Sequence, residues 1–113
     1  MHEMALAESV VGIVEDYARR ECAKRVRTVR LEIGRLSNVE LEAIRFCFDA
    51  VTRGGVADSA VLDIEEVPGT GWCMRCAVQV PLAAVLDVCP RCGGCEVTVT
   101  GGTEMRVKEL EVE

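Results

Sequence analysis

Four cysteines in two pairs constrain the fold of this chain more than any other feature. Cys73 and Cys76 form the first pair, and Cys89 and Cys92 form the second after twelve intervening residues. Each Cys-x-x-Cys pair can present two thiolates to one metal ion, and two pairs give a closed tetrahedron that suits Zn(II). Two disulfides are the alternative, but seven cysteines without an N-terminal secretory pattern favour a reducing compartment. The spacing therefore predicts a structural zinc site.

Iron is a second candidate for the same cysteines. The stretch Cys89-Pro90-Arg91-Cys92-Gly93 resembles a rubredoxin knuckle, in which iron would carry electrons. The first knuckle has Ala77 where the second has Gly93, and the aromatic core of such proteins is missing. Zinc is therefore favoured over iron. Cys95 is either a spare ligand or a turn residue beside the site, and the turn residue is favoured.

Charge and composition limit the classes of function that the chain can have. The chain has 113 residues and a net charge of −6, which disfavours binding to phosphate backbones. Residues 68–102 are neutral, whereas a zinc ribbon that grips nucleic acid would show a basic face. No apolar run approaches the length that spans a bilayer. We expect a cytoplasmic protein with no nucleic-acid or membrane partner; a zinc-ribbon module for nucleic-acid or protein interaction stays the alternative.

One stretch of the chain is nevertheless basic. Two interpretations are open: a solvated helix end followed by the outer face of a strand, which is favoured, or a docking patch for an acidic protein partner. The residues concerned are Arg19, Arg20, Lys24, Arg25, Arg27, Arg30 and Arg35.

Hydrophobic periodicity predicts the order of elements. Residues 4–24 read as an amphipathic helix, with Leu6, Val10, Ile13, Val14 and Tyr17 on its apolar face. Residues 28–34 alternate as a half-buried strand. A Ser-x-x-Glu capping box at Ser37 and Glu40 opens a second helix, which Gly54-Gly55 closes. This helix is expected to bury Leu41, Ile44, Phe48 and Val51.

The remaining strands complete the prediction. Leu62 and Ile64 lie in a second strand, and Met105 and Val107 lie in a final one, with a bulge near Lys108-Glu109 or an early end. The last strand has no core of its own, so it must return to the first two. We predict an α+β fold in which two helices pack on a three-stranded sheet, with a four-cysteine zinc-ribbon-like module inserted before the third strand.

The expected domains are residues 1–67 plus 103–113, and residues 68–102. Glycines on both sides of the inserted module suggest hinges. Within it, Val78, Val80, Leu82, Val85 and Leu86 are expected to form a hairpin and a small core. So few apolar side chains cannot fold the module alone, and zinc binding would supply the deficit. Cys22 and Cys47 are expected to be small buried residues of the helices.

The chain starts with Met1-His2-Glu3, and His2 is its one histidine. The Met1 amine, the His2 amide nitrogen and the His2 imidazole can chelate one ion in a plane. Square-planar nitrogen and oxygen donors select Cu(II) or Ni(II), and the Glu3 amide or carboxylate could complete the plane. The alternative is that this terminal histidine is a disordered polar residue without a ligand. With no second histidine, phosphate loop or Ser/His/Asp set, no catalytic residues are predicted.

Taken together, these features resemble the HypA/HybF family of nickel-insertion proteins for hydrogenases. The resemblance rests on Met1-His2-Glu3, on residues 29–37, on the two cysteine pairs and on residues 101–106. It implies a nickel site at Met1, His2 and Glu3, structural zinc at Cys73, Cys76, Cys89 and Cys92, and a carboxylate at Glu40 near the nickel end. The family is not enzymatic: it passes nickel to the [NiFe]-hydrogenase large-subunit precursor with the GTPase HypB, and some members serve urease.

Overall fold

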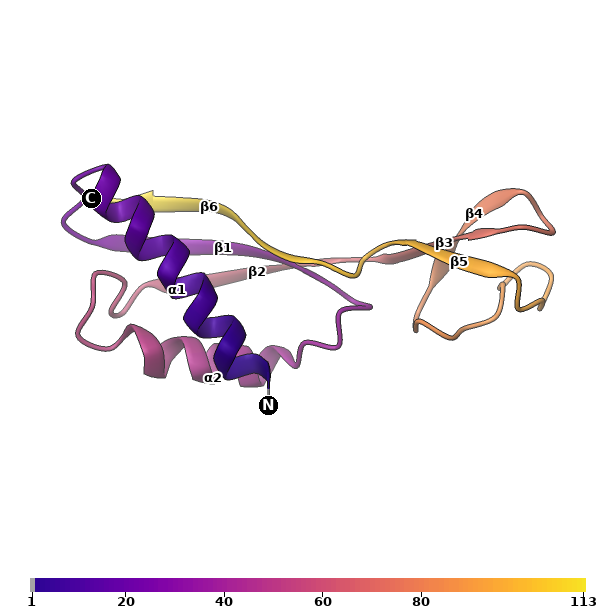
Figure 1. Ribbon diagram of the computed structural model, residues 1–113, viewed down its shortest axis with the longest axis horizontal. Helices are drawn as coiled ribbons and strands as arrows, with labels where there is room; N and C mark the ends of the chain where they lie inside the picture. The colour runs from indigo at the N-terminus through magenta and orange to yellow at the C-terminus, as the bar shows by residue number, and fades with distance from the viewer. Residues whose placement is uncertain (1) are drawn as a thin grey trace. The chain divides into compact units, whose positions relative to one another are not determined.

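The computed structural model describes residues 2–113 and consists of two helices and two three-stranded sheets (Figure 1). Met1 lies outside the described residues. The expected α+β fold is confirmed, because the cysteine module is inserted before the last strand of the first sheet. That sheet has the order β2-β1-β6, with β1 at Val26–Gly34, β2 at Val61–Val67 and β6 at Met105–Val112. The second has the order β4-β3-β5, with β3 at Gly69–Cys73, β4 at Val78–Leu82 and β5 at Val97–Gly101.

Helix α1 spans His2–Arg20 and buries a narrow stripe of small apolar side chains, Ala7, Val10, Val11, Val14 and Ala18. Ile13 and Tyr17, expected on this face, are 55% and 44% exposed. The helix ends earlier than expected because Cys22 takes a left-handed conformation (φ 52°) and the Ala23 amide donates to the Ala18 carbonyl. Cys22 is therefore exposed, and its predicted burial is wrong. Neither helix of residues 2–113 has the length and apolar character to cross a bilayer.

The first sheet has one buried and one charged face. Val29, Leu31 and Ile33 of β1 are at most 1% exposed, and Arg30 lies between them on the opposite face. Helix α2, Leu41–Thr52, contributes Ile44, Cys47, Phe48 and Thr52 to the interior, so the predicted burial of Cys47 is confirmed. The exposure pattern of β6 shifts by one residue at 108–109 and the strand continues to Val112, so it does not end early.

The predicted capping box of α2 is wrong. The helix begins one residue after Glu40, and no side chain of its own caps it. Ser37 instead belongs to the turn that follows β1, where its amide and its hydroxyl both donate to the Gly34 carbonyl, the hydroxyl at 2.6 Å. This hydrogen bond holds the Ser37 hydroxyl in the turn after β1, so the hydroxyl does not cap the first turn of α2.

The chain divides into two compact units: Met1–Leu31, Val39–Glu65 and Arg106–Glu113 form the first, and Glu32–Asn38 and Glu66–Met105 form the second. This division differs from the expected boundaries, since residues 32–38 belong with the cysteine module. The reason is Leu36, which is 6% exposed within the small core of the second unit. Backbone bonds hold it there: the Arg35 amide donates to the Val67 carbonyl and the Leu36 amide to the Gly102 carbonyl.

The core of the second unit is small and contains two cysteines: its buried members are Leu36, Cys73, Val80, Leu82 and Cys89. Val80 and Leu82 of β4 are buried as expected, but Val85 and Leu86 are 49% and 94% exposed, so their predicted place in this core is wrong. They lie beyond β4, where the chain turns away and the amides of Ala83 and Ala84 donate to the Asp87 carboxylate.

Glycines allow backbones to approach closely within the second unit. A Cβ atom added to Gly102 would lie 2.6 Å from the Pro68 carbonyl oxygen, and Gly102 also has a φ of +85°. A Cβ atom added to Gly69 would lie 2.7 Å from Leu36 Cγ. These glycines, expected as hinges, are thus required by packing and by backbone conformation.

Replacing Leu36 with Ala should destabilise the second unit, although the residue lies far from the cysteines in sequence. Leu→Ala substitutions in cores cost about 2–5 kcal/mol. We expect a lower free energy of unfolding and faster hydrogen exchange at the amides of β3 and β4. Leu86→Ala is the matched control, because that side chain is 94% exposed. Equal effects of the two substitutions would contradict the placement of Leu36.

Candidate metal centre

The four predicted cysteines meet at one point. Cys73 ends β3, Cys76 lies in the turn to β4, and Cys89 and Cys92 lie in the connection from β4 to β5. Their sulfur atoms all lie within 4.8 Å of one another. Cys73 and Cys89 are buried, whereas Cys92 is exposed. The two pairs therefore form one cluster, as the spacing predicts.

Both knuckles have the same backbone geometry. The Ala77 amide donates to the Cys73 carbonyl and the Gly93 amide donates to the Cys89 carbonyl, each at 2.8 Å. Ala77 has a φ of 53° and Gly93 a φ of 73°, so both occupy the left-handed region. The missing glycine in the first knuckle thus leaves its shape unchanged; Ala77 adopts a conformation that is costlier for a side chain.

Backbone amides point at the sulfur atoms. The amides of Cys76, Arg91 and Gly94 donate to the sulfurs of Cys73, Cys89 and Cys92, each at 3.4 Å. The amides of Cys92 and Arg91 lower the pKa of Cys89 to about 7 against the opposing effect of burial. Hydrogen bonding to the Cys92 sulfur, together with burial, raises the pKa of Cys76 to about 12. Cys89 thus loses its proton more readily than Cys76, and a bound cation would favour thiolates at the cluster.

The sulfur separation fits one tetrahedral ion. The Cys73 and Cys92 sulfurs are 3.8 Å apart. Four sulfurs at about 2.3 Å from a tetrahedral zinc would be about 3.8 Å from one another, whereas a disulfide requires about 2.05 Å. All seven cysteines are free, so the disulfide alternative does not hold in this structure. Tetrahedral sulfur suits zinc or iron, and four ligands leave no open position for a substrate. Cys95 is exposed and is not part of the cluster.

The predicted nickel residues lie at the start of α1. His2 is the first residue of the helix, and its side chain is 53% exposed. Its Nδ1 atom lies 3.7 Å from Glu3 Oε1. The Glu3 side chain is only 13% exposed. Met1 lies outside the described residues, so the geometry of a chelate that includes its amine is not described.

Glu3 links the two helices of the first unit. Its Oε2 atom accepts a hydrogen bond of 3.1 Å from the backbone amide of Glu40, the residue before α2. This amide, followed by the amide of Glu3 itself, lowers the pKa of the Glu3 carboxyl. A carboxylate at a helix N-terminus is also favoured by the helix dipole. Glu3 thus stands in for the cap that α2 lacks.

The family resemblance implied that Glu40 lies near the nickel end, but it did not predict how Glu3 and Glu40 meet. The link uses the backbone amide of Glu40, while the Glu40 side chain is exposed. The two residues are 37 positions apart, and no local pattern connects them. A terminal Glu before a helix that has no cap of its own is the signal that could have suggested the contact.

Comparisons with known proteins cover the whole chain. The model of the family described as "Hydrogenase/urease nickel incorporation, metallochaperone, hypA" matches residues 1–112. The hydrogenase maturation factor HypA of Dechloromonas aromatica (strain RCB) is 62% identical over 113 residues, which is all of both chains. The factor of the same name from Azoarcus sp. (strain BH72) is 63% identical over 110 residues, covering 97% of this chain and 96% of the relative.

Solved structures agree with these sequence matches. The solution structure of the Ni metallochaperone HypA from Helicobacter pylori is 27% identical, with a TM-score of 0.70 over 99% of this chain and 97% of that one. A second solution structure of a HypA protein is 28% identical, with a TM-score of 0.73 over 100% and 97%. The chain belongs to the HypA family of hydrogenase and urease nickel-incorporation metallochaperones.

Proposed function

We propose that the chain binds Ni(II) at Met1, His2 and Glu3 and delivers it to the large-subunit precursor of a [NiFe]-hydrogenase. The observation that carries this proposal is the placement of His2. The imidazole is more than half exposed at the first turn of α1, and its neighbour Glu3 is fastened to α2. A chelating terminus is thus presented to solvent on an anchored helix. The names of the relatives, which are hydrogenase maturation factors, support the same proposal.

The helix start leaves the required nitrogen donors available. The first four amides of an α-helix have no carbonyl partner within the helix, so the His2 amide can release its proton to solvent and bind nickel through nitrogen without breaking a helical bond. Together with the Met1 amine and the imidazole it supplies three nitrogens in one plane, which suits Ni(II). Glu3 holds this terminus against α2 through the Glu40 amide. In the carrier, Glu3 supplies the fourth ligand of the nickel ion. On transfer, a donor of the receiving protein takes this position.

A carrier must also release its ion. Few ligands, protonatable donors and an exposed imidazole favour exchange with a partner. The partners proposed are a HypB-type GTPase and the hydrogenase precursor, with urease accessory proteins as a second destination, because the family description names both hydrogenase and urease. The activity is binding and transfer without turnover. Seven free cysteines favour the reducing cytoplasm as its compartment.

The four cysteines hold structural zinc in this account. Two of them, Cys73 and Cys89, are also buried core residues, so metal binding and folding of the second unit are one event. The closed sphere of four sulfurs suits support of the fold better than cargo transfer.

Replacing His2 with Ala should abolish tight nickel binding. We expect isothermal titration of nickel into untagged, zinc-loaded protein to give one site per chain, and the site to be lost in the variant because a chelate ring is removed. Addition of residues before Met1 should have the same effect, since it removes the free amine. Glu8→Ala, on the exposed face of α1, is the control. Undiminished binding by His2→Ala would rule out this nickel site.

Replacing Glu3 with Ala should loosen the start of α2. The substitution removes the acceptor of the Glu40 amide, so we expect a lower Tm and faster hydrogen exchange at the amides of Glu40 and the first turn of α2. Glu3→Gln keeps an acceptor oxygen and should lie between Glu3→Ala and the unchanged protein. Glu8→Ala is again the control. Unchanged exchange in α2 would show that Glu3 does not cap it.

Replacing Cys73 with Ser should remove zinc and unfold the second unit. Elemental analysis of the unchanged protein is expected to give one zinc per chain, and chelation of this zinc should abolish protection of β3, β4 and β5 from hydrogen exchange. Cys95→Ser should retain the metal, because Cys95 is exposed and outside the cluster. A red, iron-containing protein would instead support an electron carrier.

A further inference from the structure

The arginines of the basic stretch in the first unit are not equally satisfied. Arg19 and Arg20 both hydrogen-bond the Asp16 carboxylate. Arg30 hydrogen-bonds Asp63 at 3.1 Å and also lies near two carboxylates of β6. Arg25 and Arg27 differ: their Nε atoms lie 3.7 and 3.8 Å from a single oxygen of Glu113. Both distances are too long for hydrogen bonds, so these two guanidinium groups have the most to gain from a further carboxylate.

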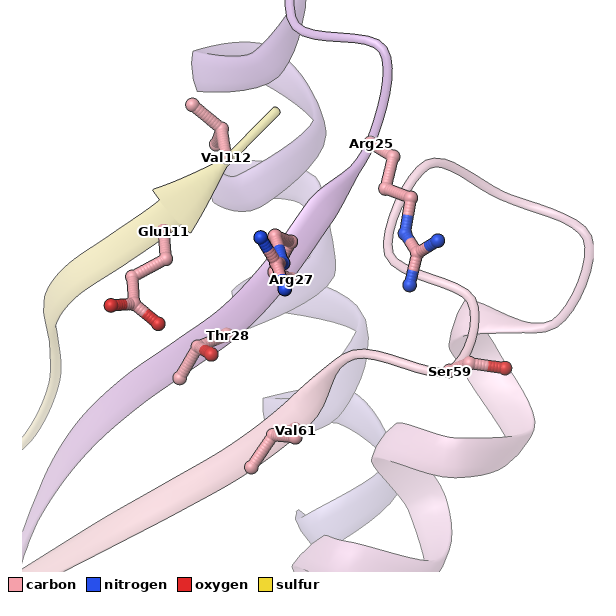
Figure 2. A pocket seen from close by; sticks show the side chains of 7 residues that line it. All are labelled: Arg25, Arg27, Thr28, Ser59, Val61, Glu111 and Val112. Atoms are coloured by element: carbon pink, nitrogen blue, oxygen red, sulfur yellow. The ribbon is translucent and has the colours of Figure 1, made fainter.

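The same two arginines line a cavity of about 630 Å³ in the first unit, which we call the arginine pocket (Figure 2). Figure 2 shows Arg27 on β1 and Arg25 just before this strand, standing between Glu111 of β6 and Ser59 ahead of β2. Thr28 adds a hydroxyl group that can donate a hydrogen bond, whereas the Ser59 hydroxyl already donates to Asp58 Oδ1 at 3.4 Å. Two valines complete the lining, so the complete set is Arg25, Arg27, Thr28, Ser59, Val61, Glu111 and Val112.

From this arrangement, we propose that the arginine pocket receives a carboxylate side chain from an acidic peptide segment of a protein partner. Glu113 indicates that the ligand is a carboxylate, because its own carboxylate already lies at ion-pair distance from both guanidinium groups. Exposed pairs of this kind contribute little stability. A carboxylate that entered the pocket could make bidentate hydrogen bonds to an arginine, displace Glu113 and accept a hydrogen bond from the Thr28 hydroxyl.

Charge and lining together select an acidic peptide over other anions. The wall carboxylate of Glu111 lies 3.8 Å from Arg30 Nη2, which is an ion-pair distance and, as for Glu113, too long for a hydrogen bond. The lining contains no aromatic side chain on which a base could stack. The lining thus offers two guanidinium groups and a hydroxyl group but no stacking surface, which suits an acidic peptide better than a nucleic acid. This inference concerns the charged face of the sheet and is independent of nickel.

The test is fluorescence anisotropy with a fluorescein-labelled hexaglutamate peptide and the zinc-loaded full chain. Arg25→Gln/Arg27→Gln should weaken binding by about tenfold or more, the loss expected when hydrogen bonds to charged groups are removed. Arg19→Gln/Arg20→Gln changes the net charge equally and should alter the Kd by less than about twofold. Glu113→Gln removes the internal competitor and should tighten binding severalfold, whereas Glu8→Gln should not.

Three results would overturn the inference. The first is an absence of hexaglutamate binding. The second is an equal loss in the two double variants, which would reduce the effect to overall charge. The third is tighter binding of a labelled oligothymidylate of equal charge, which would assign the pocket to nucleic acid instead of an acidic peptide.

Discussion

The second unit depends on four sulfur atoms gathered around one centre. Cys73 and Cys89 belong to the buried core itself, together with Leu36, Val80 and Leu82. A core this small does not by itself offset the conformational entropy of the unit, and the zinc proposed for the four sulfurs would contribute most of the folding free energy. The amides that point at the sulfurs prepare the two knuckles for negative charge. In the proposed zinc-bound state, metal, core and backbone would form one structure, and the ion would not exchange without unfolding what surrounds it.

This dependence separates the roles of the two metals in the account. An ion that holds a fold together is poorly suited to be handed over, whereas an ion at an exposed chain terminus can be exchanged by protonation or by a competing donor. Glu3 fixes the position of the N-terminus, because its carboxylate accepts a hydrogen bond that joins the first turn of α1 to the start of α2. The proposed nickel-binding end is therefore exposed and yet held in place by this hydrogen bond. Nickel handling by the family is consistent with such a division.

The sequence predicted features whose physics is local. The alternation in β1 and the cysteine spacing each follow from one short segment, and both were predicted. Contacts between distant segments were missed: Leu36 packs against the cysteine module, and Glu3 replaces the cap expected from Ser37. Val85 and Leu86 are apolar but exposed, since the chain turns away after β4. Cys22 is exposed because it ends α1 in a left-handed conformation, which no apolar pattern signals.

X-ray absorption at both metal edges of one untagged, nickel-loaded sample would distinguish the two proposed sites. We expect zinc surrounded by four sulfurs at about 2.3 Å. We expect nickel surrounded by nitrogen and oxygen donors that include one imidazole, with no sulfur. Nickel bound to cysteine sulfur, or zinc with fewer than four sulfurs, would contradict the separation of a structural centre from a terminal carrier site.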